Sequence, residues 1–315
     1  MRILRVSIFV LAAVFAAYAQ PAVRRSVAFT IDDLPVVSTR NAIAHRQEIT
    51  NKIIAHIRHE KIPAVGFVNE GKLYSQGKRL DAEIDLLRQW ANAGLELGNH
   101  SYSHKSLNAI DLAVYQKDIL DGETITKELM KEKGKTLRYF RHPYLQTGMT
   151  MEVKAGLDKF LEEHRYTIAP VTIDNADWIF ARAYDNAFDK GDMDLMKRVG
   201  EAYVPYMELK LDYWERQSVK LFGREVRQTL LIHANLINSD YLDDLAKMLK
   251  KRKYDLITLE EALKDEAYRL PDKFMGRGGI SWLHRWALDR GRETILPDEP
   301  KVPEFVANAA GVEAE

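Results

Sequence analysis

The chain has 315 residues, which is long enough for one large α/β domain or two small ones. Its 46% hydrophobic and 29% charged residues form an ordinary globular balance, and the 46 Lys and Arg equal the 46 Asp and Glu in number. This neutral balance, without a basic run, argues against nucleic acid as a partner. Because the chain has no cysteine, disulfides are excluded, and any bound metal must be held by histidine and carboxylate.

The first residues have the pattern of a secretory signal peptide. Arg2 and Arg5 precede an apolar run at 6–17, and residues 17–19 offer a cleavage site flanked by small side chains. The apolar run is too short to span a bilayer comfortably, so we expect cleavage rather than a stable membrane anchor. Residues 1–19 are therefore predicted to be a signal peptide, and the mature protein is expected to be exported, either periplasmic or secreted.

Short apolar, β-branched runs alternate with amphipathic segments along the rest of the chain. The pattern predicts strands at 27–31, 64–69, 95–98, 138–143, 166–173, 229–233 and 254–259. It predicts helices at 41–60, 79–93, 107–132, 150–163, 192–221 and 239–251. This alternation, with about seven repeats, indicates an α/β fold with a mostly parallel sheet, either open or closed.

Two segments do not fit the short connections of such a fold. Residues 180–225, which contain the long helix predicted at 192–221, are interpreted as a helical insertion on the side of the domain or over its mouth. The segment from Pro297 onward is rich in Pro, Glu and Ala, and we expect it to be poorly ordered. The expected organisation is one domain at 20–290 and a C-terminal tail at 291–315.

Five groups of chemically active side chains each follow a predicted strand. In chain order they are Asp32 and Asp33, His100 and His104, residues 141–144, residues 174–178, and His233. The carboxyl ends of parallel strands share one rim, so we expect these groups to meet there. The four-residue spacing of the two histidines would place both imidazoles on one face of a helical turn.

This set of side chains suits metal-assisted hydrolysis. Two neutral imidazoles and one carboxylate fit zinc or a similar divalent ion and leave a position open for water. A bound metal makes that water acidic and polarises a carbonyl. A second carboxylate can take the proton of the water, and a histidine on the other side can protonate a leaving group. Because successive strand residues point to opposite sides, Asp32 and Asp33 are not expected to do the same job.

The five groups resemble, in order, the motifs of the NodB-type polysaccharide deacetylases, carbohydrate esterase family four. The matches are "TIDDLP" for Thr-Phe-Asp-Asp-Gly, "HSYSH" for His-(Ser/Thr)-x-x-His, "RHPY" for Arg-x-Pro-Tyr, "DNADW" for Asp-x-x-Asp-Trp, and "LLIH" for an apolar run ending in His. All five lie between residues 28 and 235. The resemblance implies a distorted (β/α) barrel of about seven strands with a helical insertion.

The resemblance also implies a role for each matching residue. Asp33, His100 and His104 correspond to the metal ligands, with zinc as the expected ion. Asp32 corresponds to the general base, and Arg141 corresponds to the residue that pairs with this base and orients it.

The remaining motif positions correspond to the acid and to the substrate groove. His233 corresponds to the general acid, and Asp177 to the carboxylate that raises its pKa. The backbone N–H of Tyr144 would help to stabilise the oxyanion, and Trp178 would line the groove, where a sugar face can stack.

The sequence departs from the family pattern at several positions. Leu34 replaces the glycine of the first motif, and we expect it to narrow the groove beside the metal. Residues 234–235 replace the common residue after the acid histidine. Trp282 and His284 lie outside the motifs and are interpreted as part of a packed amphipathic helix rather than of the site.

The function that the resemblance implies is removal of N-acetyl groups from a polysaccharide such as a peptidoglycan- or chitin-like glycan. The expected partner is thus an acetylated glycan, and the sequence leaves the oligomeric state open. An O-acetyl esterase with the same centre is an alternative. A glycan-binding module that has lost turnover is another, and the presence of Asp32 and His233 argues against it.

Overall fold

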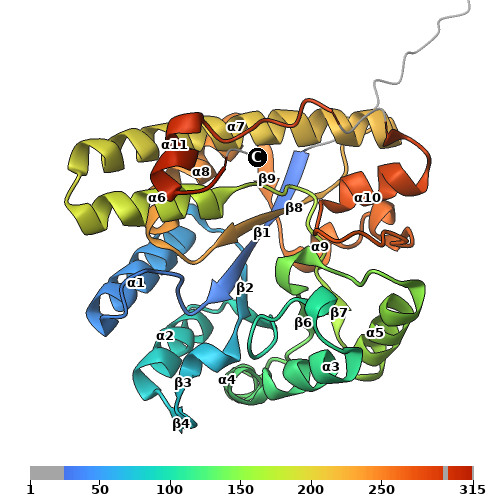
Figure 1. Cartoon of the computed structure of the whole chain (residues 1–315), viewed down its shortest axis with the longest axis horizontal. Helices are drawn as coiled ribbons and strands as arrows, with labels where there is room; N and C mark the ends of the chain where they lie inside the picture. The colour runs from blue at the N-terminus through green and yellow to red at the C-terminus, as the bar shows by residue number, and fades with distance from the viewer. Residues whose placement is uncertain (1–24, 294–296, 314–315) are drawn as a thin grey trace, which may run out of the picture.

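The computed structural model describes residues 25–293 and 297–313, and the predicted signal peptide at 1–19 lies outside these ranges. It shows a parallel sheet surrounded by helices (Figure 1). The strands are β1 (Arg25–Leu34), β2 (Val65–Val68), β3 (Tyr74–Ser75), β4 (Lys78–Arg79), β5 (Glu96–Asn99), β6 (Tyr139–Phe140), β7 (Thr167–Ile168), β8 (Gln228–His233) and β9 (Tyr254–Leu256).

Helices follow most of these strands and cover the outside of the sheet (Figure 1). The α-helices are α1 (Ile43–Glu60), α2 (Asp81–Asn92), α3 (Leu112–Asp121), α4 (Thr124–Glu132), α5 (Met151–Glu163), α6 (Asp177–Lys190), α7 (Met193–Phe222), α8 (Leu236–Lys251), α9 (Leu259–Ala262), α10 (Trp282–Asp289) and α11 (Glu304–Ala310). The short 3-10 helices are η1 (Glu70–Leu73), η2 (Leu107–Ala109), η3 (Pro143–Leu145) and η4 (Glu266–Arg269). Among the described residues, no helix is both long enough and apolar enough to cross a membrane.

Strand β1 pairs with three neighbours, β2, β8 and β9, in a seven-stranded sheet whose main order is β7-β6-β5-β2-β1-β8. The side chains of residues 27–32 are buried, as expected for a parallel strand covered on both faces. Beyond β7 the chain returns to the other edge, where Ile173 bridges Leu230 of β8. The sheet therefore curls back on itself, and the expected distorted (β/α) barrel of about seven strands is confirmed.

The helix predicted at 107–132 is interrupted in the structure. It is divided into η2, α3 and α4, with a break at Gly122. A side chain at Gly122 would collide with the backbone of Ser101 and Tyr102, since its Cβ would lie 2.6 Å from the Ser101 carbonyl carbon. The amide of Tyr102 also donates to the carbonyl of Asp118 at 2.9 Å. The break thus lets the loop that carries His100 and His104 dock on α3.

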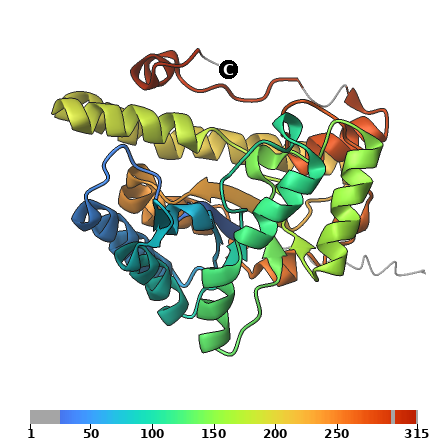
Figure 2. The same ribbon diagram turned by 60° about the horizontal axis from the view of Figure 1, so that its bottom comes forward.

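The segment interpreted as a helical insertion forms a helical hairpin. Helix α6 ends at Gly191, which adopts a left-handed conformation, and α7 then begins with a cap from Asp192, whose side chain accepts from the Leu195 amide at 3.0 Å. The long helix predicted at 192–221 is confirmed as α7, which runs along one side of the barrel (Figure 2). Its aromatic residues Tyr203 and Trp214 are buried in the main hydrophobic core.

The expectation of poor order from Pro297 onward is wrong. Helix α11 packs along α6, above the barrel (Figures 1 and 2), and its Phe305 lies beside Arg198 of α7. Val302, Val306 and Ala310 recur at four-residue intervals, and all three are buried in the main core. Asn186 of α6 also donates to the carbonyl of Ala309 at 2.9 Å. The Pro- and Glu-rich composition concealed this apolar face, which has the spacing of a helix.

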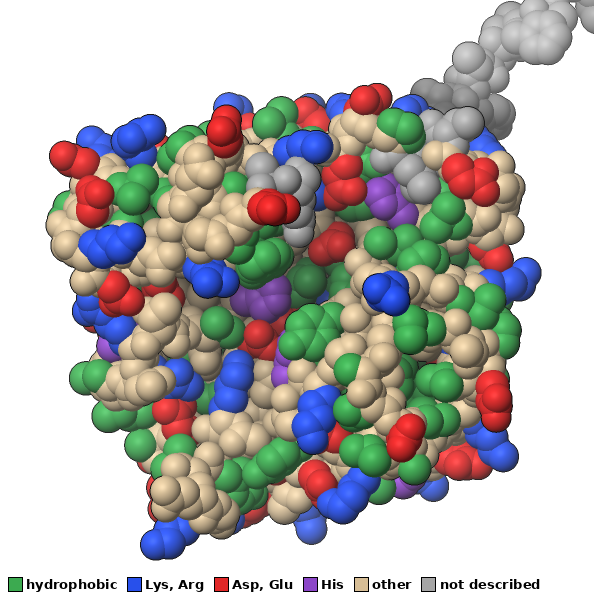
Figure 3. Space-filling model, viewed as in Figure 1, with side chains coloured by type: hydrophobic (Ala, Val, Ile, Leu, Met, Phe, Trp, Pro, Cys, Tyr) green, Lys and Arg blue, Asp and Glu red, His purple; other side chains and the backbone are tan. Residues whose placement is uncertain are grey.

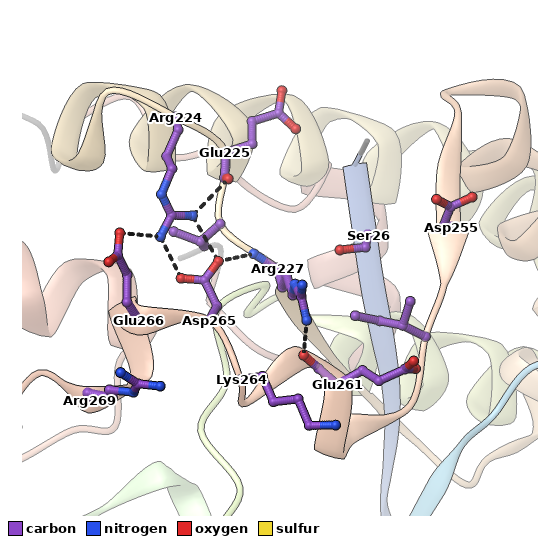
Figure 4. A pocket seen from close by; sticks show the side chains of 12 residues that line it. Ser26, Arg224, Glu225, Arg227, Asp255, Glu261, Lys264, Asp265, Glu266 and Arg269 are labelled. Atoms are coloured by element: carbon purple, nitrogen blue, oxygen red, sulfur yellow. Dashed lines mark hydrogen bonds and ion pairs between the residues drawn. The ribbon is translucent and has the colours of Figure 1, made fainter. Parts of the chain in front are cut away.

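A charged hollow of about 710 Å³ lies at the opposite end of the strands from the predicted site (Figure 4). Arg224 binds both carboxylate oxygens of Asp265, at 2.8 and 2.7 Å. Asp265 also accepts the backbone amides of Arg227 and Ala267, each at 3.0 Å. These contacts tie the start of β8 to η4, so we interpret this cluster as structural.

Candidate metal centre and active site

Three side chains come together at the carboxyl ends of β1 and β5. Oδ1 of Asp33 lies 3.5 Å from Nε2 of His104 and 3.7 Å from Nε2 of His100. Together the three side chains offer one carboxylate oxygen and two imidazole nitrogens, all within 4.8 Å of one another. The expected convergence of Asp33, His100 and His104 is therefore present in the structure.

The spacing of the two histidines predicted a helical turn, and this prediction is wrong. They belong to a loop after β5, in which Ser101 and His104 have φ values of 65° and 52°. The Ser101 hydroxyl accepts from the His104 amide at 3.0 Å and stabilises this turn. The imidazole rings consequently lie edge to face, with centroids 4.8 Å apart.

The donor set fits a divalent cation. A tetrahedral zinc ion bound at about 2.0–2.1 Å separates its ligand atoms by about 3.3 Å, close to the two distances from Asp33. Within the described residues, Oδ1 of Asp33 is buried without a hydrogen-bond partner, which is a cost unless a cation binds there. The His100 Nδ1–H donates to the carbonyl of Arg141 at 2.8 Å, which leaves Nε2 free to bind a metal.

Electrostatics favour the metal-binding protonation states. Burial lowers the pKa of His100, and the neighbouring His104 lowers it further, so both imidazoles are held neutral. Burial alone would raise the pKa of Asp33, but Lys72 and the surrounding imidazoles hold it well below its usual range. Metal ligands of this kind must be neutral imidazole and ionised carboxylate.

Asp32 lies beside the three candidate ligands and has different partners. Its Oδ2 is 3.6 Å from Nε2 of His100 and 3.8 Å from Nη1 of Arg141. Burial raises the pKa of Asp32 to about 6, although the Arg141 guanidinium acts in the opposite direction. Among the described residues, its Oδ1 has no hydrogen-bond partner. This carboxylate therefore lines the cleft beside the candidate ligands, where it can accept a proton.

The expectation that Asp32 and Asp33 point to opposite sides is wrong. Asp33 has a φ of 67°, and the pairing of β1 with β2 shifts register between Ile31 and Leu34. This change of backbone conformation brings both carboxylates to the same cleft. The ammonium of Lys72 donates to the Asp33 carbonyl at 2.7 Å and holds the left-handed turn, a contact that the motifs did not indicate.

The sequence led us to expect that Leu34 narrows the groove beside the metal, and this expectation is wrong. Its side chain is fully buried and packs over Gly66 of β2, where a Cβ would lie 2.6 Å from Leu34 Cδ2. Gly66 on the neighbouring strand thus leaves room for the leucine that stands in place of the motif glycine, and Leu34 belongs to the core.

Arg141 is fully buried behind Asp32. Its Nη2 donates to the hydroxyl of Thr30 at 2.7 Å, and the guanidinium lies 4.9 Å from the centroid of the Phe67 ring. These contacts fix the Arg141 guanidinium on the core side of Asp32. Nearby, Tyr144 lies in the first turn of η3, where a backbone N–H has no partner within the helix.

On the other side of the cleft, His233 forms a tight pair with Asp177. The distance from His233 Nδ1 to Asp177 Oδ1 is 2.7 Å, and the His233 amide donates to Oδ2 at 2.8 Å. Burial alone would lower the pKa of His233, but the charge and hydrogen bond of Asp177 outweigh it and raise the pKa to about 9. Asn238 of α8 donates to Asp177 at 2.9 Å, a contact the sequence analysis missed.

These groups face a cleft of about 680 Å³. Figure 3 shows a hollow near the middle of one face, with histidine and acidic side chains within it and hydrophobic side chains around it. Tyr144 and Trp178 line the cleft and are exposed residues, 55% and 43% accessible. Trp282 and His284 are instead buried in α10 and do not line this cleft, in agreement with their interpretation as packing residues.

The cleft also has lining residues that lie outside the five motifs. They are Leu145 of η3, Tyr206 and Lys210 of α7, Gly279 and Ile280, and residues 299–302 of the C-terminal segment. No local pattern marked the residues after Leu145, because they come from the insertion, from the residues just before α10 and from the segment expected to be poorly ordered.

Comparisons with known proteins find similarity to polysaccharide deacetylases. Residues 19–158 match the family model described as polysaccharide deacetylase. A curated relative, the peptidoglycan-N-acetylglucosamine deacetylase of Bacillus cereus, is 26% identical over 162 residues, which cover 51% of this chain and 50% of the relative. The chain thus spans about half the length of the curated relative it matches.

Solved structures of the same class give weaker similarities. The peptidoglycan deacetylase PdaC from Bacillus subtilis is 22% identical, covering 76% of this chain and 92% of that one, with a TM-score of 0.47. A family 4 carbohydrate esterase from Streptomyces lividans is 18% identical, covering 76% and 95%, with a TM-score of 0.44. BA3943 from Bacillus anthracis, a pseudoenzyme of that family, is 16% identical, covering 78% and 67%, with a TM-score of 0.49. The matched residues 19–158 contain the first three of the five motifs, so this part of the chain is similar to the polysaccharide deacetylase family.

Proposed function

We propose that this protein is an exported, metal-dependent hydrolase that removes N-acetyl groups from a glycan, such as a peptidoglycan- or chitin-like saccharide. The observation that carries the proposal is the meeting of Asp33, His100 and His104 with Asp32 and His233 in one cleft. A peptidoglycan-N-acetylglucosamine deacetylase among the relatives supports the substrate class.

Each side chain has a distinct part in the proposed reaction. A divalent cation, zinc in our proposal, held by Asp33, His100 and His104 would polarise the acetyl carbonyl and acidify water. Asp32 accepts a proton from the attacking water as the new C–O bond forms. His233 donates a proton to the sugar nitrogen as the C–N bond breaks, so that a free amine and acetate leave.

Other residues hold these groups and the substrate in place. Arg141 favours the ionised form of Asp32 and orients it. Asp177 fixes the ring of His233, and Asn238 in turn holds Asp177. The Tyr144 amide is proposed to stabilise the oxyanion of the tetrahedral intermediate. Trp178, an exposed residue, offers an apolar surface against which a sugar face can stack.

The metal requirement leads to a direct test of this function. Metal-loaded protein is expected to release acetate from N-acetylglucosamine oligomers and polymers. Thorough chelation should lower the rate at least about 100-fold, because a catalytic cation contributes several kcal/mol of transition-state stabilisation. Restoring zinc should restore the rate. Acetate release that chelation leaves unchanged would contradict the proposal.

An O-acetyl esterase would use the same centre. Amide and ester glycans compared side by side distinguish the two functions, because aryl acetates are hydrolysed by either enzyme. A glycan-binding module without turnover would bind these saccharides and release no acetate from any of them when loaded with metal.

The pairing of His233 with Asp177 predicts a pH dependence. A raised pKa means that His233 remains protonated, and able to act as an acid, up to about pH 9, and that this ability is lost above it. Asp177→Asn removes the carboxylate, so the alkaline limb of kcat/KM should move down by about 1 to 3 pH units. An alkaline limb that stays in place in pH–rate profiles of the variant would refute the assignment of His233.

A further inference from the structure

The cleft is bounded on one side by residues that none of the five motifs contains. We call this set the outer wall: Tyr206 and Lys210 of α7, Gly279 and Ile280, and residues 299–302 of the C-terminal segment. These residues come from three separate parts of the chain. Because the fold brings these three parts together along the cleft, their side chains bear on which substrates fit in it.

The C-terminal segment is tied to α7 at the rim of the cleft. The ammonium of Lys210 forms an ion pair with Glu299 and lies 5.6 Å from the centroid of the Trp214 ring. The side chain of Lys210 is only 6% exposed. A buried ammonium is stable only with an anionic partner, so Glu299 and Lys210 hold the segment and the helix together.

Beyond the rim, the same segment is anchored by apolar packing. Val302 and Val306 are buried, and the guanidinium of Arg198 lies 4.9 Å from the centroid of the Phe305 ring. The carbonyl of Ala309 accepts from Asn186 at 2.9 Å. Residues 299–302 are thus fixed at both ends, as a rigid part of the cleft.

The outer wall extends from the metal side of the cleft to the acid side. On the metal side, Gly279 packs so closely against the carbonyl of Tyr144 that a Cβ would collide with it, and the Tyr144 ring is 4.5 Å from that of His104. On the acid side, the hydroxyl of Tyr206 accepts from the Ala176 amide at 3.1 Å, next to the residue that holds His233.

We propose that the outer wall closes one end of the cleft and restricts the enzyme to the terminal sugars of a short N-acetylated saccharide. An interior sugar of a polymer needs an exit for the chain in both directions, and the outer wall obstructs one of them. The cleft has a volume of about 680 Å³, within the range of clefts that hold a small ligand. This inference rests on the deacetylase function proposed above.

The test locates the acetyl group that is lost. Metal-loaded protein is incubated with N-acetylglucosamine oligomers of two and six sugars, and fragment mass spectrometry assigns each free amine to a position. The wild type should remove acetate from one terminal position of the hexamer at least about tenfold faster than from interior positions, a discrimination within reach of pocket shape.

A double variant lowers the outer wall without removing its anchors. Ile280→Ala with Lys301→Ala shortens two lining side chains and keeps Lys210, Glu299 and Val302. This variant should deacetylate interior sugars. A tenfold ratio of terminal to interior rates in the wild type should fall to about threefold or less in the variant. Lys133→Ala, an exposed lysine that does not line the cleft, is the matched control and should keep the wild-type pattern.

The outcomes separate the two proposals. Wild-type deacetylation of interior sugars would overturn the outer-wall inference and support the deacetylase function. A terminal-only pattern that is unchanged in the double variant would also overturn the inference, because the limit would then lie elsewhere. No acetate from either oligomer, with metal bound, would overturn the proposed function and, with it, this inference.

Discussion

Replacing Asp32 by Asn is expected to abolish most of the deacetylase activity while leaving the metal in place. An amide of the same size cannot accept the proton of the attacking water, and general base catalysis typically contributes about 10²–10⁴-fold to the rate. Asp32 is not one of the three candidate ligands, so metal stoichiometry should remain at the wild-type value. The measurement is kcat/KM for acetate release together with the metal content of the same sample.

A matched control distinguishes the loss of the catalytic base from the loss of any buried carboxyl group. Asp185 is also buried, and burial raises its pKa to about 6, as it does for Asp32, but Asp185 does not line the cleft. Asp185→Asn should therefore retain the wild-type kcat/KM. A near-normal rate for Asp32→Asn would show that another group takes the proton.

Replacing His104 by Ala is expected to remove the metal itself. The change leaves one imidazole and one carboxylate, Asp33 and His100, where three donors stood. Loss of an outer partner of a metal ligand costs about 10–100-fold in affinity, and loss of a ligand should cost at least the upper end of this range. Metal affinity measured by competition with a chelator, and acetate release, should fall together.

The control for this change is His56→Ala. His56 lies on α1, where its Nε2 is 3.1 Å from the carbonyl of Ser239, and it does not line the cleft. This variant should keep both metal and activity. If His104→Ala kept wild-type metal affinity, the cation site would have to be sought elsewhere in the protein.

The strands were predictable because continuous apolar, β-branched runs have few alternatives to a buried parallel strand. The rule that parallel strands share one active rim then brought Asp32, Asp33, His100 and His233 together from sequence positions far apart. The roles of these residues came from the resemblance to a family and remain proposals. The structure adds the distances on which those roles depend.

The errors have local physical causes. Alternation along a strand failed at Asp33 because its backbone is left-handed, and helical spacing failed at His104 because the loop is built from hydrogen bonds instead. Asn238 was missed because a polar residue in the first turn of a helix resembles ordinary capping, as with Asn235, which caps α8. Composition hid the helix that begins at Glu304, since only its buried face is apolar.

The most direct test of the account is the position of a metal ion in the protein. Anomalous scattering from zinc-soaked crystals of the wild type should show one strong peak bonded to Asp33, His100 and His104 at about 2.0–2.2 Å. The electron density of the same crystals should place Asp32 and His233 on either side of that ion. A fully soaked crystal with no peak at these three side chains, or with zinc bound by other residues, would contradict the account.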